Sequence, residues 1–195
     1  MNAANALTSL RLVLSPVFFV FAFLPLWADG RFALLSTVVL WILFVIIELS
    51  DILDGAVARG LGIVSDLGKL LDPFADVVSR LTYFLVFVVL GIMPAWMFLL
   101  IMYREVGIIF VRMMMMRDGV ALAARKGGKT KAVMYAVSAG LGLVLLMNIR
   151  LGSFAAFATV LPWVVLASFG VSVFLSWASF LDYLIILYRH YKGRA

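Results

Sequence analysis

The sequence has no cysteine, and its 195 residues include only one histidine and ten carboxylates. Without cysteine the chain can form neither a disulfide bond nor a thiolate metal site, so oxygen atoms would have to bind any metal ion. Charged residues make up 13% of the chain and hydrophobic residues 66%, whereas a soluble domain carries about 25% charged residues. This composition excludes an ordinary soluble domain and predicts an integral membrane protein.

Apolar runs without charges locate the membrane-spanning helices, since each crossing needs about 20 residues. We predict an all-α bundle with six spans, at residues 10–28, 32–58, 68–90, 93–116, 131–149 and 155–188. The sequence GIMP at 91–94 separates the third span from the fourth. We interpret the last run as one long helix with Pro162 near its outer end. The length suits one bundle, so we expect a single membrane-embedded domain over residues 1–195.

The distribution of cations predicts the orientation in the membrane. Six spans place both termini on one side, and that side carries ten cations: Arg59, Lys69, Arg117, Arg125, Lys126, Lys129, Lys131, Arg189, Lys192 and Arg194. The other side carries Arg31 and Arg150. By the positive-inside rule the richer side is cytoplasmic, so we expect a multi-pass protein of the cell membrane with both termini in the cytoplasm. The net charge of +6 fits this topology and contact with anionic lipid, and no nucleic-acid-binding surface is evident.

Half of the carboxylates lie in one segment, residues 50–76, on the side predicted to be cytoplasmic. Residues three or four apart share a helix face, so Asp51 and Asp54 lie on one face of the second span. Asp72 and Asp76 lie in the same way on the third span. Opposed across a bundle, the four carboxylates would repel one another unless cations neutralised them. Oxygen ligands favour Mg²⁺, Mn²⁺ or Ca²⁺, and the set could hold two ions about 3.5–4 Å apart for phosphoryl chemistry.

Small residues and one arginine accompany these carboxylates. Gly55 and Ala58 remove side-chain bulk next to the first pair, and Gly68 does so one turn before the second pair. Arg59 adds a fixed cation that suits a phosphate oxygen. We therefore expect the acidic segment to accommodate a phosphorylated ligand close to the backbone.

The acidic segment fills every fixed position of the pattern D-x-x-D-G-x-x-A-R-x8-G-x3-D-x3-D. In this it resembles the CDP-alcohol phosphatidyltransferases, and the sequence NALTSLR at 5–11 is similar to the N-x-L-T-x-x-R start of that family's first helix. The six-span layout is also similar. The resemblance implies a transferase in which a hydroxyl group of an acceptor alcohol attacks the phosphorus of a CDP-linked lipid and releases CMP, with the active site facing the cytoplasm.

The resemblance also implies roles for individual residues. The residues implied to bind two divalent ions, which we expect to be Mg²⁺ or Mn²⁺, are Asp51, Asp54 and Asp72. Asp76 matches the position of the general base and of a further metal contact. The residues implied to surround the cytidine and phosphates of CDP-diacylglycerol are Gly55, Ala58, Arg59 and Gly68. Arg80 follows Asp76 by four residues, so we expect a salt bridge that orients the Asp76 carboxylate. Family analogy implies a homodimer.

Two further segments carry buried or clustered charge, REVGIIFVR in the fourth span and GGKTK before the fifth. Arg104 and Glu105 near the centre of a span are costly, which favours a functional role. Arg112 lies two turns beyond Arg104 on a similar face. Together with Lys129 and Lys131, these arginines predict a basic pocket that suits a phosphorylated acceptor better than free serine or choline.

The order of these charges resembles one branch of the family. An R-E pair, an arginine eight residues later and a G-K-x-K stretch are similar to the phosphatidylglycerophosphate synthases, whose acceptor is sn-glycerol 3-phosphate. Inositol 1-phosphate is the alternative acceptor, because its phosphate would use a similar pocket. The alternative class of protein is a transporter of a phosphorylated substrate, since transporters also use carboxylates within the membrane.

Overall fold

The computed structural model describes the backbone of residues 3–61, 66–120 and 126–192, and the side chains of residues 8–51, 71–120, 130–154 and 156–192. All regular secondary structure in these parts of the chain is helical, and short turns join the helices. The helices are α1 (Ala3–Trp27), α2 (Ala33–Leu61), α3 (Asp66–Val89), α4 (Ala95–Arg117), α5 (Lys126–Leu151) and α6 (Leu161–Lys192), with a short 3-10 helix at Ala155–Phe157. The predicted all-α architecture with six long helices is confirmed.

Four of these helices, α1, α2, α5 and α6, are long and apolar enough to cross a membrane. α3 and α4 are of similar length but contain more charge. The charged residues that interrupt them are Asp66, Lys69, Asp72, Asp76 and Arg80 in α3, and Arg104, Glu105, Arg112 and Arg117 in α4. In α3 and α4 these charges interrupt the apolar sequence, whereas α2 and α5 carry theirs towards the helix ends.

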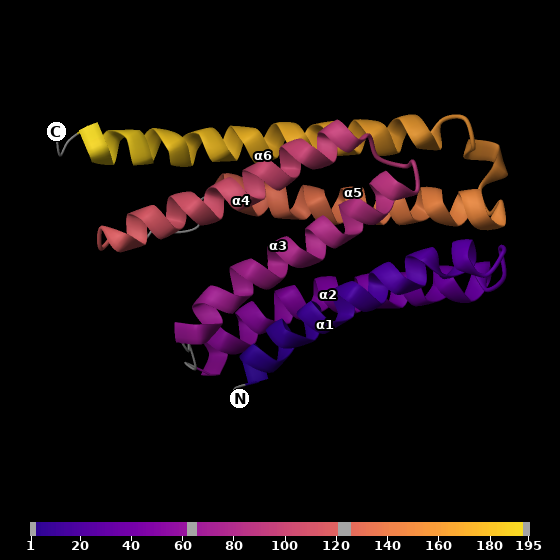
Figure 1. Cartoon of the computed structure of the whole chain (residues 1–195), viewed down its shortest axis with the longest axis horizontal. Coiled ribbons are helices and arrows are strands. Elements are labelled where there is room, and N and C mark those ends of the chain that lie inside the picture. The colour runs from indigo at the N-terminus through magenta and orange to yellow at the C-terminus, as the bar shows by residue number, and fades with distance from the viewer. Residues whose placement is uncertain (1–2, 62–65, 121–125, 193–195) are drawn as a thin grey trace.

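The six helices form two groups that α3 joins (Figure 1). α1 packs against both α2 and α3, while α6 packs against both α4 and α5. α3 also contacts α4 and α5, and it runs obliquely between the two groups in Figure 1. Both ends of the chain lie at the same end of the bundle in this view. This is expected, because successive helices reverse direction and an even number of them returns the chain to the end where it began.

The turn between α3 and α4 lies where the GIMP sequence was predicted to interrupt the apolar run. α3 ends at Val89, and Gly91 has a φ of 73°, a left-handed conformation that glycine adopts without steric cost. Pro94 then precedes the first residue of α4. Ile92 and Met93 are buried between these two residues, so the turn closes one end of the core.

The last helix begins later than predicted. Residues 155–157 form the 3-10 helix, and α6 runs from Leu161 to Lys192 rather than over 155–188. Pro162 is the second residue of α6, where an N–H group would have no partner within the helix and its absence costs little. The predicted start was wrong because the apolar run was extended back to residue 155, although Pro162 is of a type that favours the first turn of a helix.

Aromatic residues fix α3 within the core. The Tyr83 ring lies 4.8 Å from the Phe18 ring of α1, between centroids, and Phe84 meets Tyr135 of α5 edge to face at 5.3 Å. Phe84 also contacts Phe169 of α6 at 5.9 Å. Such pairs add to the stabilisation from burial alone. The C-terminal half of α3 is therefore packed on several sides, while its N-terminal half carries the carboxylates.

Candidate functional site

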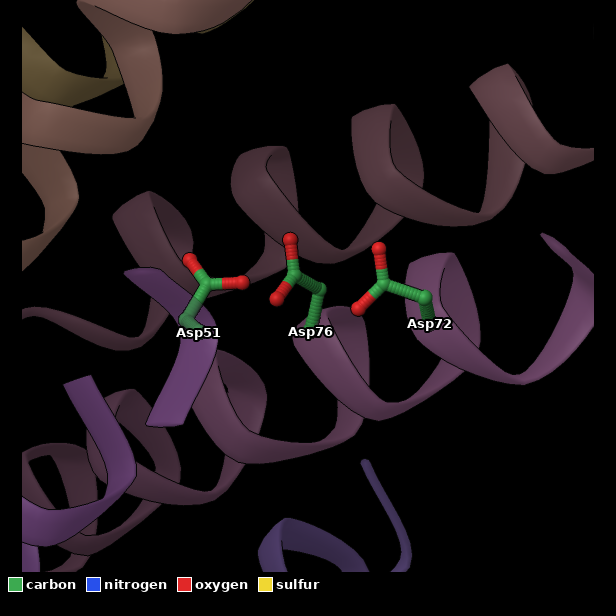
Figure 2. Close-up of side chains that lie close together, drawn as sticks. All are labelled: Asp51, Asp72 and Asp76. Atoms are coloured by element: carbon green, nitrogen blue, oxygen red, sulfur yellow. The ribbon is translucent and has the colours of Figure 1, made fainter. Parts of the chain in front are cut away.

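Three of the predicted metal-binding aspartates lie together between α2 and α3 (Figure 2). Asp51 belongs to α2, and Asp72 and Asp76 lie one turn apart on α3, as their i,i+4 spacing requires. Each offers a carboxylate oxygen, and these oxygens all lie within 4.8 Å of one another. Figure 2 shows Asp76 between the other two side chains. We call these three residues the aspartate cluster.

Two arginines from different helices contact the aspartate cluster. Arg11 of α1 donates from Nη1 to Oδ1 of Asp51 at 2.8 Å and of Asp76 at 2.5 Å. Its Nη2 donates to Oδ1 of Asp72 at 2.5 Å. Nη2 of Arg80 lies 3.3 Å from Oδ2 of Asp51 and 3.4 Å from Oδ2 of Asp76. The expected contact between Arg80 and Asp76 is therefore present, and Arg80 also reaches α2.

The charges of the cluster do not cancel. Its three carboxylates face two guanidinium groups, those of Arg11 and Arg80. Glu48 lines the same small cavity as both arginines and adds a further carboxylate. Clustered carboxylate oxygens with an excess of negative charge are the ligands that hard divalent cations prefer. The donor set that the structure brings together therefore fits a divalent metal ion.

The other residues of the acidic motif lie on helices, but their side chains are outside the described residues. Those on α2 are Asp54, Gly55, Ala58 and Arg59, and Gly68 lies on α3. The side chain of Lys129, on α5, is also outside the described residues. Their predicted roles stay predictions.

A cavity of about 220 Å³ opens beside the aspartate cluster. Asp51 and Asp76 line it, together with residues of α4, α5 and α6. Three cations of the predicted acceptor pocket, Arg104, Arg112 and Lys131, line this cavity. The structure thus brings carboxylates suited to a metal ion and cations suited to a phosphate to one space.

Arg104 uses its donors within the protein. Its Nε donates to the carbonyl oxygen of Ser176 at 3.1 Å, and its Nη1 donates to Glu105 at 3.0 Å. Nη2 lies 3.4 Å from the hydroxyl of Ser179. The side chain is buried. Arg104 is predicted to bind phosphate. These contacts also connect α4 to α6, so Arg104 has a structural role as well.

Replacing Arg104 by Met should destabilise the protein by about 3–5 kcal/mol, because the change leaves a buried carboxylate without one of its partners. The measurement is the midpoint of thermal unfolding in detergent. Arg117→Met is the matched control, since Arg117 lies on the same helix with a side chain that is 73% exposed, and it should change stability by less than about 0.5 kcal/mol. Equal midpoints for the two variants would contradict the anchoring role.

Lys131 and Arg112 differ in whether their donor groups have partners within the described part of the protein. The ammonium group of Lys131 donates to Oε1 of Glu105 at 2.6 Å, and both side chains are buried. Arg112 lies over the ring of Tyr183, 6.0 Å from its centroid. Its Nε is buried without a hydrogen-bond partner among the described residues. Arg112 is therefore the cavity cation with a donor still to be satisfied.

The contact of Arg11 with the cluster was not predicted from the sequence NALTSLR. The available signal was that Arg11 is the only charged residue in the 25 residues of α1. A buried arginine must find its counter-charge on another helix when its own helix offers none. The contact of Lys131 with Glu105 was not predicted either, because it joins two helices and Glu105 already has Arg104 beside it on α4.

Comparison with known proteins agrees with this geometry. The family model described as CDP-alcohol phosphatidyltransferase matches residues 1–181. The chain is 36% identical over 143 residues to the CDP-diacylglycerol--glycerol-3-phosphate 3-phosphatidyltransferase of Treponema pallidum, an alignment that covers 69% of this chain and 65% of that protein. It is 34% identical over 174 residues to the protein of the same description from Bacillus subtilis, covering 84% and 86%.

A third relative is the probable phosphatidylglycerophosphate synthase of Mycobacterium tuberculosis strain H37Rv. It is 37% identical over 140 residues, and the alignment covers 72% of this chain and 65% of the relative. The matched part therefore spans 65% of the length of the Treponema and Mycobacterium proteins and most of the length of the Bacillus protein.

Proposed function

The chain belongs to the CDP-alcohol phosphatidyltransferase family, and we propose that it transfers a phosphatidyl group from CDP-diacylglycerol to sn-glycerol 3-phosphate. The products are phosphatidylglycerophosphate and CMP, as in phospholipid biosynthesis. The observation that carries this proposal is the cavity that Asp51 and Asp76 of the aspartate cluster line together with Arg112 and Lys131. The names of the Treponema and Bacillus relatives support the same acceptor.

The aspartate cluster, with Asp54, would hold Mg²⁺ or Mn²⁺, and four carboxylates suffice for two ions. When bound, such ions offset the negative charge of the diphosphate and of the leaving CMP. The chain's own part is to hold the carboxylates together. Arg80 holds two of them together by contacting Oδ2 of both Asp51 and Asp76. Arg59 and the small residues of the motif would receive the phosphates and cytidine of CDP-diacylglycerol.

Asp76 is the proposed general base. Its carboxylate lines the same cavity as the cations proposed to bind the acceptor. The acceptor hydroxyl loses its proton to this carboxylate, and its oxygen forms a bond to the phosphorus that carries the diacylglycerol. The bond from that phosphorus to the oxygen of CMP breaks, and CMP leaves with the electron pair.

The acceptor phosphate would bind Arg112 and Lys131. A charge-assisted hydrogen bond to phosphate would satisfy the free Nε of Arg112. Glu105 holds the Lys131 ammonium at the cavity wall. An acceptor without a phosphate would leave the buried Nε of Arg112 without a hydrogen-bond partner among the described residues, which is costly. Lys129 would extend the same pocket.

The four apolar helices support a multi-pass membrane protein. Within that frame we propose that α3 and α4 also cross the cell membrane, as one domain over residues 1–195, with both termini and the cavity facing the cytoplasm. The excess of cations on that side supports this orientation. A homodimer follows from family analogy.

The purified chain in detergent, with CDP-diacylglycerol and Mg²⁺, tests the proposal. We expect CMP release and phosphatidylglycerophosphate with sn-glycerol 3-phosphate, and neither product with glycerol, free inositol, serine or choline. Preference for inositol 1-phosphate would keep the phosphate pocket and change the acceptor. Preference for serine or choline would overturn both. Absence of CMP with every acceptor would favour the transporter instead.

Replacing Arg112 by Ala should raise the KM for sn-glycerol 3-phosphate by about 10–100-fold, because a charge-assisted hydrogen bond contributes about 1.5–3 kcal/mol. The KM for CDP-diacylglycerol should change little, as expected when a contact to one substrate is lost. Steady-state rates of CMP release measure both constants. Arg117→Ala, at an exposed position of the same helix, should leave both unchanged. An effect on CDP-diacylglycerol alone would assign Arg112 to the other substrate.

A further inference from the structure

Arg11 occupies the position between the three carboxylates of the aspartate cluster. Its two terminal nitrogens bind Oδ1 of Asp51, Asp72 and Asp76 at 2.5–2.8 Å, and its side chain is only 1% exposed. A guanidinium group in this position supplies the positive charge that keeps the carboxylates together when no metal ion is present.

The backbone of Arg11 is held there by contacts that do not involve the cluster. One turn along α1, the hydroxyl of Ser15 donates to the hydroxyl of Ser79 on α3 at 3.0 Å. A further turn along, Phe18 packs on Tyr83. The approach of α1 to the cluster therefore does not depend on Arg11. Its long side chain can change rotamer while the helix keeps its place.

Arg11 binds the same three carboxylate groups that could hold a metal ion. Arg80 contacts Oδ2 of Asp51 and Asp76, and Arg11 takes Oδ1 of all three aspartates. A divalent ion carries twice the charge of a guanidinium group and interacts correspondingly more strongly with the same carboxylates. An ion bound to these oxygens would displace Arg11 from at least part of the cluster.

We propose that Arg11 is an internal counter-ion that competes with divalent metal ions for the aspartate cluster. Arg11 stabilises the metal-free protein and weakens metal binding, so the apparent affinity for the ion is set by the exchange of one cation for another. This inference rests on the metal site of the proposed function.

The test measures Mn²⁺ binding to the full chain in detergent by titration calorimetry, without substrates. Arg11→Gln should lower the Kd for Mn²⁺ by about tenfold or more, because the competing group is gone. Thermal unfolding in excess EDTA should show a lower midpoint for this variant, whereas saturating Mn²⁺ should restore most of the loss. Arg11→Met removes the same charge from a side chain of similar length and serves as the second neutral variant if Arg11→Gln does not fold.

Two controls separate displacement from other effects. Arg150→Gln removes a partly buried arginine that bonds Ser36 and the carbonyl oxygen of Ala22, away from the cluster, and should leave the Kd unchanged. Arg80→Gln removes a cation from the edge of the cluster and should lower the Kd by less than Arg11→Gln does.

The outcomes are distinct. Unchanged or weaker Mn²⁺ binding by folded Arg11 variants would overturn the inference, and so would an equal gain in Arg80→Gln, which would indicate a general effect of charge. If the unsubstituted chain did not bind Mn²⁺, the proposed metal site itself would fail. A supporting role for Arg11 in the fold alone predicts lower stability but no gain in affinity.

Discussion

Replacing Asp76 by Asn should lower kcat by about 10²–10⁴-fold, the usual contribution of a general base. The amide keeps the size and position of the carboxylate but cannot accept the proton of the attacking hydroxyl. The KM for sn-glycerol 3-phosphate should change little, because the cations proposed to bind its phosphate are untouched. Steady-state rates of CMP release with both substrates varied measure these constants.

Asp29→Asn is the matched control for this substitution. Asp29 is exposed, lies beyond the end of α1 and has a φ of 49°, a conformation that asparagine tolerates. The control should keep full activity. Near-normal turnover of Asp76→Asn would rule out its role as the base. A loss of Mn²⁺ affinity as large as that of Asp51→Asn would make Asp76 mainly a metal ligand.

Removing divalent ions should have an equally large effect. In excess EDTA, CMP release should fall by at least about 10²-fold, because metal ions stabilise charge in the transition state by several kcal/mol. The arginines of the cluster lie beside the carboxylates but leave an excess of negative charge, so they cannot replace two divalent ions at the diphosphate. Activity in the presence and absence of chelator is the measurement.

Restoration by Mg²⁺ or Mn²⁺ completes that experiment. Because Arg11 neutralises part of the cluster, the protein should stay folded in EDTA, and size-exclusion chromatography before and after chelation checks this. Full turnover in excess chelator would contradict the proposed metal dependence. Loss of activity through irreversible unfolding would show up as a failure of added metal to restore it.

The helices could be predicted from the sequence because apolar runs and their interruptions are local. Gly91 and Pro94 separate α3 from α4 as expected. Hydropathy did not locate the start of α6, since residues 155–160 are as apolar as the helix that follows. The local signal was Pro162, which suits the first turn of a helix and would be costly in its interior.

The site was predictable to the extent that helix periodicity determines it. The spacing of Asp72 and Asp76 puts them on one face of α3, and the structure brings both to Asp51. The pairing of Arg11 with the cluster and of Lys131 with Glu105 joins residues 26 to 65 positions apart. Those contacts depend on which helices pack together, and the local spacing of residues does not reveal that packing.

The division of the bundle into two groups has a consequence for how such a protein can evolve. In the part that the structure describes, the aspartate cluster and its arginines belong to α1–α3, whereas Arg112 and Lys131 belong to α4–α6. Under the proposed function, substitutions in the second group would alter the recognition of the incoming alcohol without moving the aspartates proposed to bind the metal ions. Gene duplication followed by change in α4–α6 alone would thus offer a short route to a new phospholipid headgroup.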